Sequence, residues 1–175
     1  MSCVTSADEK MLLRMVRKIA DYQFGRSAGE RLFPENVIFK ISKKTGRIRQ
    51  IWDGGVLIAT LNPTSGFLNL TIEGAERLVE NGKAISRWVK VRDDAAVFVE
   101  KGKNVFAKHV VDVDRGIRPM EEVLVLNSRG EVIAVGKAIL SGAEMLEFTW
   151  GVAVKVRRGK IGKTKKGKRT KNNRR

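Results

Sequence analysis

The sequence predicts an α+β fold: a small N-terminal domain of helix and antiparallel sheet, then a small β-barrel, then a disordered basic tail. Three observations predict it. A segment near the N-terminus has apolar residues at helical spacing. Short apolar and β-branched runs between turn residues follow along most of the chain. Beyond Gly159 this pattern stops and basic residues dominate. We expect the parts to span residues 1–82, 83–159 and 160–175.

The first element is a helix over about residues 7–24. Ser6 and Glu9 have the spacing of a capping box, in which each side chain accepts from a free backbone N–H at a helix start. Gly25 is a typical helix terminator. The apolar residues at helical spacing are Leu12, Met15, Val16, Ile19 and Tyr22.

Four strands and a second helix complete the predicted N-terminal domain. A loop around Pro34 leads into a hairpin, "NVIFKIS" and "GRIRQIW", joined by "KKTG". "GVLIATL" is continuously apolar, which is typical of a central strand, and "FLNLTI" follows a turn. Thr71 is a candidate cap for a helix that carries Ile72, Ala75, Leu78 and Val79 and stops at "NGK".

The second half is richer in short strands. We expect strands at "ISRWVKV", "NVFAKHVVDV" and "WGVAVKVRR", with a hairpin over residues 122–140. A short helix lies between the first two strands, with Asp93 as its cap and Gly102 as its terminator, and "SGAEMLE" is a turn or short helical piece. Many short strands with long apolar runs favour a closed barrel.

The charge predicts a polyanionic partner. The net charge is +16, and twelve of these charges lie in residues 155–175, which hold seven Lys, five Arg and no acid. A second interpretation, that the tail only confers solubility, stays open.

Composition also excludes classes of site. The single cysteine, Cys3, and single histidine, His109, can form neither an internal disulfide nor a Cys/His metal site, and we expect no cofactor. Neither a membrane span nor a signal peptide is predicted, so a cytoplasmic protein with no membrane partner is expected. No Ser/His/Asp or Cys/His arrangement is suggested, and the aspartate pairs at 93–94 and 112–114 are explained as a helix cap and as strand residues. We therefore expect no enzymatic activity from this chain.

Residues 84–159 resemble a PUA domain, a small RNA-binding β-barrel. The motifs that carry the resemblance are "AAVFVEKGKNVFAKHVVDVD", "IRPMEEVLVLNSRGEVIAVGKA" and "GVAVKVRRG". Met120 departs from the pattern, because the family often has glycine there. Residues 6–82 are similar to the domain that precedes the PUA domain in archaeal archaeosine tRNA-guanine transglycosylase, through "ADYQFG", "TGRIRQI" and "LTIEGAERL". This resemblance implies the RNA-binding end of that enzyme without its catalytic domain, and an archaeal source.

The resemblance also implies where RNA binds. In PUA domains RNA lies against the helix, the glycine loop, the second strand and part of the last strand. Basic side chains there suit phosphates, and an aromatic or His109 can stack on an unpaired base. Two arginines at alternate positions of an N-terminal strand can extend the phosphate contacts. The candidate residues are Lys101, Gly102, Lys103, Asn104, Phe106, Lys108, His109, Lys155, Arg157, Arg158, Arg47 and Arg49.

Simpler interpretations of these residues stay open at this point. Phe106 is more often a core residue of such a barrel, and His109 is equally explained as a surface residue without a role. Arg115 and Arg118 are explained by pairing with the acidic residues at 121–122. The two arginines at 47 and 49 fit a solvated sheet surface.

The sequence therefore predicts a non-catalytic RNA-binding protein that engages tRNA or other structured RNA in RNA modification. Two alternatives remain: a ribosome-assembly factor that docks on rRNA, and the RNA-binding subunit of a split tRNA-modifying enzyme with a catalytic partner.

Overall fold

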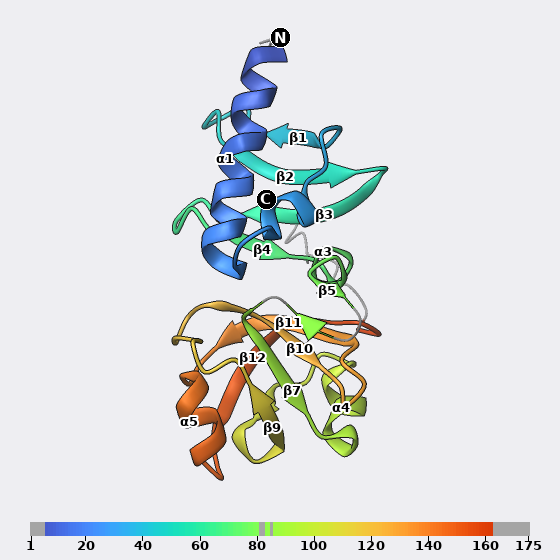
Figure 1. Cartoon of the computed structure of the whole chain (residues 1–175), viewed down its shortest axis with the longest axis vertical. Coiled ribbons are helices and arrows are strands. Elements are labelled where there is room, and N and C mark those ends of the chain that lie inside the picture. Colours follow the sequence, from blue (N-terminus) through green and yellow to red (C-terminus); the bar gives the residue numbers. More distant parts are fainter. Residues whose placement is uncertain (1–5, 81–82, 85, 163–175) are drawn as a thin grey trace, which may run out of the picture.

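A computed structural model shows that the protein consists of two units stacked along its long axis (Figure 1). The structure describes residues 6–80, 83–84 and 86–162. The N-terminal unit pairs a long helix with a four-stranded sheet, and the second unit is a small barrel flanked by two short helices. The predicted α+β class is confirmed, and the predicted tail beyond residue 162 lies outside the described residues.

Helix α1 (Ser6–Phe24) matches its predicted bounds, and three of its five predicted apolar residues, Leu12, Val16 and Ile19, pack against the core. The buried residues are Leu13, Val16, Ala20 and Phe24, spaced by three and four positions. Met15 and Tyr22, expected on the apolar face, are instead exposed, Tyr22 at 76%. The side chain of Ser6 lies outside the described residues, so its capping role stays a prediction. A short helix, α2 (Ala28–Leu32), occupies part of the region expected to be a loop.

The four predicted N-terminal strands are present. They are β1 (Ile38–Ile41), β2 (Ile48–Asp53), β3 (Val56–Leu61) and β4 (Leu68–Leu70), paired antiparallel in that order, so the apolar strand β3 is internal as expected.

Helix α3 (Ile72–Glu76) begins at the predicted cap: the Thr71 hydroxyl accepts a hydrogen bond from the Gly74 N–H at 3.0 Å. It is shorter than expected, because Val79 belongs to strand β5 (Val79–Glu80), which pairs with β6 (Lys83–Ala84).

The barrel can close because one predicted strand is interrupted. Its sheet has the order β8-β12-β11-β10-β7-β9. The two edge strands, β8 (Val105–Phe106) and β9 (Val110–Val113), are consecutive in sequence and joined by the 3-10 turn η1 (Ala107–His109). The single strand predicted over residues 104–113 is therefore two strands, and the chain passes from one edge of the sheet to the other within three residues. The sheet consequently curls until its edges nearly meet.

The remaining barrel elements follow the predicted order. They are β7 (Trp88–Val91), α4 (Asp93–Val99), β10 (Glu122–Leu126), β11 (Val132–Ala138), α5 (Gly142–Glu147) and β12 (Val152–Gly159). Asp93 is not the cap of α4: Arg92 holds the N-cap position, and the Asp93 carboxylate accepts a hydrogen bond from the Ser128 hydroxyl at 2.9 Å. Helix α5 carries a capping box formed by Ser141 and Glu144.

Strands β10 and β11 are buried on both faces. Val123, Val125, Ile133 and Ala134 pack into the barrel core. Other residues of the same strands, Leu124, Leu126, Val132 and Val135, pack into the core of the N-terminal unit, and a register shift in β11 accounts for the adjacent Ile133 and Ala134. This double burial explains their uninterrupted apolar sequences, since a strand with one wet face alternates. The two units therefore share a continuous apolar contact, and the division at residues 82 and 83 stays a prediction.

None of the helices within the described part of the chain is long and apolar enough to cross a membrane. The cytoplasmic location stays a prediction.

Candidate nucleic-acid interface

A tight turn at Gly102 ends helix α4 and forms an exposed basic surface. Gly102 has φ of 90°, which side chains other than glycine rarely adopt. The N–H groups of Gly102 and Lys103 donate to the carbonyl oxygens of Val99 and Phe98, at 2.9 and 3.1 Å, so they satisfy the free carbonyls of the helix end. All residues from Lys101 to Asn104 are exposed, and a Cβ at Gly102 would meet nothing within 4 Å. The turn is therefore open to approach by a large partner.

The end of β12 is packed against this turn. The Val156 N–H donates to the Asn104 side-chain oxygen at 3.0 Å, and the Ile161 N–H donates to the Glu100 carbonyl oxygen at 2.9 Å. Gly159 comes so close that a Cβ there would lie 2.3 Å from the Glu100 carbonyl oxygen. Residues 160–162, the first residues of the predicted tail, consequently lie beside the glycine turn. Asn104, a candidate contact residue, thus also has a structural role.

Several other predicted contact residues lie on the surface of the barrel. Lys108 is exposed on η1, and Lys155 is exposed on β12. Phe106 is 44% exposed, so its placement in the barrel core was the wrong interpretation. His109 is half-buried, and its Nδ1 atom has no hydrogen-bond partner among the described residues. Arg158 is half-buried on β12. Their roles in RNA binding stay predictions.

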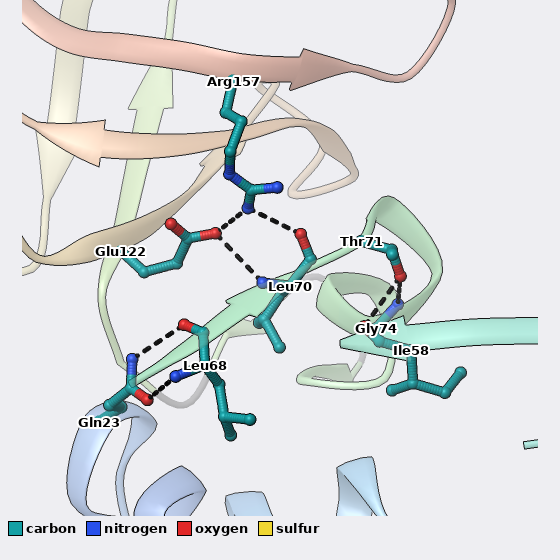
Figure 2. A network of polar contacts seen from close by, with 8 residues as sticks. All are labelled: Gln23, Ile58, Leu68, Leu70, Thr71, Gly74, Glu122 and Arg157. Atoms are coloured by element: carbon teal, nitrogen blue, oxygen red, sulfur yellow. Dashed lines mark hydrogen bonds and ion pairs between the residues drawn. The ribbon is translucent and has the colours of Figure 1, made fainter. Parts of the chain in front are cut away.

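Arg157 differs from the other candidates, because its guanidinium is already engaged. Figure 2 shows Nη2 of Arg157 between the carboxylate of Glu122 and the carbonyl oxygen of Leu70, to which it donates at 2.8 Å. The Leu70 N–H in turn donates to Glu122 Oε1 at 3.2 Å. Arg157 therefore connects β12 to β10 and to strand β4 of the N-terminal unit, which is a structural role that the sequence did not predict.

Glu122 is the buried centre of this network. Its side chain is 3% exposed. Burial raises the pKa of Glu122 from its ordinary value of 4.5 to about 7, against the opposing effect of the Arg157 charge and of its hydrogen bonds. Close by, the Gln23 side chain exchanges two hydrogen bonds with the backbone of Leu68, at 2.7 and 3.1 Å, and so fixes the end of α1 to β4 (Figure 2).

The N-terminal arginine pair lies on a different sheet. Arg47 and Arg49 are both exposed and flank the buried Ile48, with Arg47 directly before β2, and their role in binding phosphate stays a prediction. One Nη of Arg47 donates to the Pro63 carbonyl oxygen at 3.2 Å.

Glu121 and Glu122 form ion pairs with other arginines than the sequence suggested. Among the described residues Glu121 pairs with Arg87 at 2.9 Å and Glu122 pairs with Arg157, rather than with Arg115 or Arg118. The Arg118 backbone N–H donates to the Glu121 carboxylate at 2.7 Å.

Two exposed aromatic residues were missed as candidates. Phe148 and Trp150 stack with ring centroids 6.3 Å apart, and Trp150 is 77% exposed. The next residue, Gly151, accepts a hydrogen bond from the Ala107 N–H at 3.0 Å, which places this loop beside η1. The signal in the sequence was the pair of aromatics in "FTWG", of which only Trp150 falls in a predicted element, at the start of the last strand. Across residues 6–162, apart from the undescribed positions, no group of three or more His, Cys, Asp or Glu residues is arranged to hold a metal ion.

Comparisons with known families match the two halves of the chain to two domains, in the order that the sequence predicts. Residues 14–84 match the patch-forming domain C2 of tRNA-guanine transglycosylase, and residues 87–160 match the PUA domain. The tRNA-guanine(15) transglycosylase of Methanothermobacter thermautotrophicus is 45% identical over 148 residues, which is 84% of this chain and 22% of the relative. The enzyme of the same name from Thermococcus kodakarensis is 47% identical over 146 residues, 83% of this chain and 25% of the relative. The chain thus spans about a quarter of the length of these relatives.

A solved structure shares the whole fold. A hypothetical protein from Pyrococcus horikoshii superposes with a TM-score of 0.73 at 22% identity, covering 88% of this chain and 93% of that one. The two resemblances expected from the sequence are therefore confirmed, and relatives of both halves occur in archaea. The chain is a PUA-domain protein whose N-terminal half belongs with the C2 domain of archaeal tRNA-guanine transglycosylases.

Proposed function

We propose that this chain binds tRNA, or another structured RNA, in RNA modification, and that it supplies binding rather than chemistry. The observation that carries the proposal is the glycine turn after α4. There an open backbone, the exposed Lys101 and Lys103, and the start of the basic tail lie together.

The turn suits a ribose-phosphate chain. At Gly102 no side chain keeps a phosphate away from the backbone, and the flanking lysines supply positive charge. Lys108 and Lys155 extend this charge along η1 and β12, and the exposed ring of Phe106 offers a face for an unpaired base. RNA in the A-form hides its major groove, so recognition here would depend on backbone shape, 2′-OH groups and frayed ends.

Similarity favours tRNA over ribosomal RNA. The relatives that match across both domains are named for a reaction on tRNA. A partner chain with transglycosylase-type chemistry is accordingly the second part of the proposal. Purification of the complex from native cells tests it: a catalytic RNA-modifying chain should copurify, whereas pre-ribosomal particles would favour the ribosome-assembly alternative.

The binding site is tested by changing Lys101, Lys103 and Lys108 together to alanine. We expect weaker tRNA binding at constant salt, and a salt dependence of log K that is shallower by about 2 to 3, since each lysine contributes roughly one phosphate contact. All three side chains are exposed, so the fold should be retained, and circular dichroism checks this.

The matched control changes Lys10, Arg14 and Lys18 to alanine. These three exposed residues lie on α1, and replacing them removes the same positive charge as the glycine-turn variant. If the control weakens tRNA binding as much as the glycine-turn variant, the turn is not the site and only net charge matters.

A further inference from the structure

A cavity lies between the two units, and its lining residues are separate in sequence from the glycine turn. Its volume is about 330 Å³, at the lower end of the range for small-molecule pockets. The N-terminal unit contributes Tyr22 and Gln23 from the end of α1 and Phe67 from the turn before β4. The barrel contributes Glu122 and Lys137. Figure 2 shows Gln23 and Glu122 contacting the same short strand β4, at Leu68 and at Leu70.

The wall on the N-terminal side is aromatic. Tyr22 and Phe67 stack nearly parallel, with ring centroids 6.0 Å apart and an interplanar angle of 11°. They are 76% and 44% exposed, so their outer faces are available. Exposed aromatic faces next to basic residues are the usual stacking surfaces for unpaired bases.

The barrel side of the cavity is supported by Glu122. Its Oε1 atom binds the Leu70 N–H and Arg157, whereas Oε2 is buried without a hydrogen-bond partner among the described residues. Because Oε2 is not accessible from the cavity, Glu122 supports the cavity wall and leaves contact with a ligand to the residues around it.

Positive charge leads to the same cavity. Lys137 on β11 is the register partner of Glu122 on β10, and Lys155 on β12 is the register partner of Lys137. Register partners have Cβ atoms roughly 5 Å apart on one face of a sheet. Lysine charges therefore continue from the exposed β12 surface to the cavity, along which a phosphate backbone can pass.

We propose that this cavity binds one unstacked nucleotide. The base stacks on the Tyr22–Phe67 pair, and its phosphate pairs with Lys137. The site should accept any of the four bases, because every base has an aromatic face. The inference rests on the proposed RNA binding, since the nucleotide would belong to the bound RNA.

Titration of the full chain with mononucleotides tests the cavity, followed by NMR chemical shifts. We expect saturable shifts at Tyr22, Phe67 and Lys137 with GMP and with the other mononucleotides, because stacking tolerates every base. Ribose 5-phosphate should leave the aromatic shifts unchanged. Absence of saturable shifts with the mononucleotides, or equal aromatic shifts with ribose 5-phosphate, would overturn the proposal.

Variants locate the binding. Changing Tyr22 and Phe67 together to alanine should weaken GMP binding by about tenfold or more, because stacking is lost. Met11→Ala removes another exposed apolar side chain of α1, 64% exposed, and should bind GMP like the wild type. Equal GMP binding by the double variant and by Met11→Ala would refute the stacking site.

The same proteins separate this inference from the proposed function. If tRNA binding depends on Lys101, Lys103 and Lys108 while no mononucleotide enters the cavity, only the cavity inference fails. If mononucleotides bind in the cavity and the chain binds no tRNA or other structured RNA, the proposed function fails instead.

Discussion

Arg157 and Glu122 form an ion pair at the junction of the two units, where one guanidinium nitrogen reaches both the buried carboxylate and the Leu70 carbonyl oxygen. The pair connects the last strand of the barrel to β10 and to the edge of the N-terminal sheet. Lys160, just after β12, adds a second link, to Glu76 of α3 at 2.9 Å. The end of β12 thereby contacts the N-terminal unit as well as the glycine turn.

Replacing Arg157 with alanine should lower the free energy of unfolding by about 2 kcal/mol, because Glu122 and the Leu70 carbonyl oxygen would lose their donor and Glu122 would have to stay charged without a partner or take up a proton. Chemical denaturation followed by circular dichroism measures this. Arg158→Ala on the same strand is the control and should change stability by less than about 0.5 kcal/mol. Equal effects of the two changes would mean that the pair does not stabilise the junction.

Stability should fall as pH rises from about 4.5 to about 7. The pKa of Glu122 is raised in the folded state, so between its ordinary value of 4.5 and about 7 the folded protein holds a proton that the unfolded chain has released. Unfolding is therefore favoured at the upper end of this window, by up to about 3 kcal/mol.

Glu122→Gln isolates this effect. Because other carboxylates titrate in both proteins, the difference in unfolding free energy between wild type and variant is the quantity to follow from pH 4 to 8. The difference should shift in favour of the variant as pH rises, and a difference independent of pH would contradict the raised pKa.

Gly159 and Gly102 should respond differently to alanine. A Cβ at Gly159 would lie 2.3 Å from the Glu100 carbonyl oxygen, so Gly159→Ala should cost about 2 kcal/mol and displace the glycine turn from β12. The Cβ added by Gly102→Ala would meet nothing within 4 Å. This change should therefore lower the free energy of unfolding by only about 1 kcal/mol, because φ is positive at this position.

Denaturation measures both costs, and amide shifts of residues 100–104 report the turn. A Gly159→Ala protein with wild-type stability and shifts would show that the close approach is not required.

Removing residues 163–175 should flatten the salt dependence of RNA binding. This segment carries five Lys and three Arg. If about five of them contact phosphates, the slope of log K against log salt should decrease by roughly 3.5 to 4.5. Filter binding of tRNA at several salt concentrations measures the slope, and an unchanged slope would remove the tail from the interface.

The positions of most elements could be predicted because they depend on local patterns. The Thr71 cap, the four N-terminal strands, Gly102 at the end of α4 and the basic residues around it are each specified by a few neighbouring residues. The alternation of Arg47 and Arg49 about Ile48 is of the same kind.

The errors lie where tertiary contacts override local pattern. The run from Val105 to Val113 has the composition of one strand, yet its two halves pair with different strands and η1 lies between them. Val79 fits a helical pattern but pairs with Ala84 instead.

The sequence by itself determined the two-part α+β fold, its families and a basic region beside a glycine turn, since periodicity, turn residues and charge are properties of short segments. Only the tertiary structure decided that Arg157 pairs with Glu122, that Phe106 faces outward, and that Tyr22 and Lys137 border one cavity. The packing of β10 and β11 against both cores brings Arg157 to Glu122 and the two walls of the cavity together, and the pairing of β8 with β12 sets the position of Phe106. These relationships join residues far apart in the chain, which no local pattern specifies.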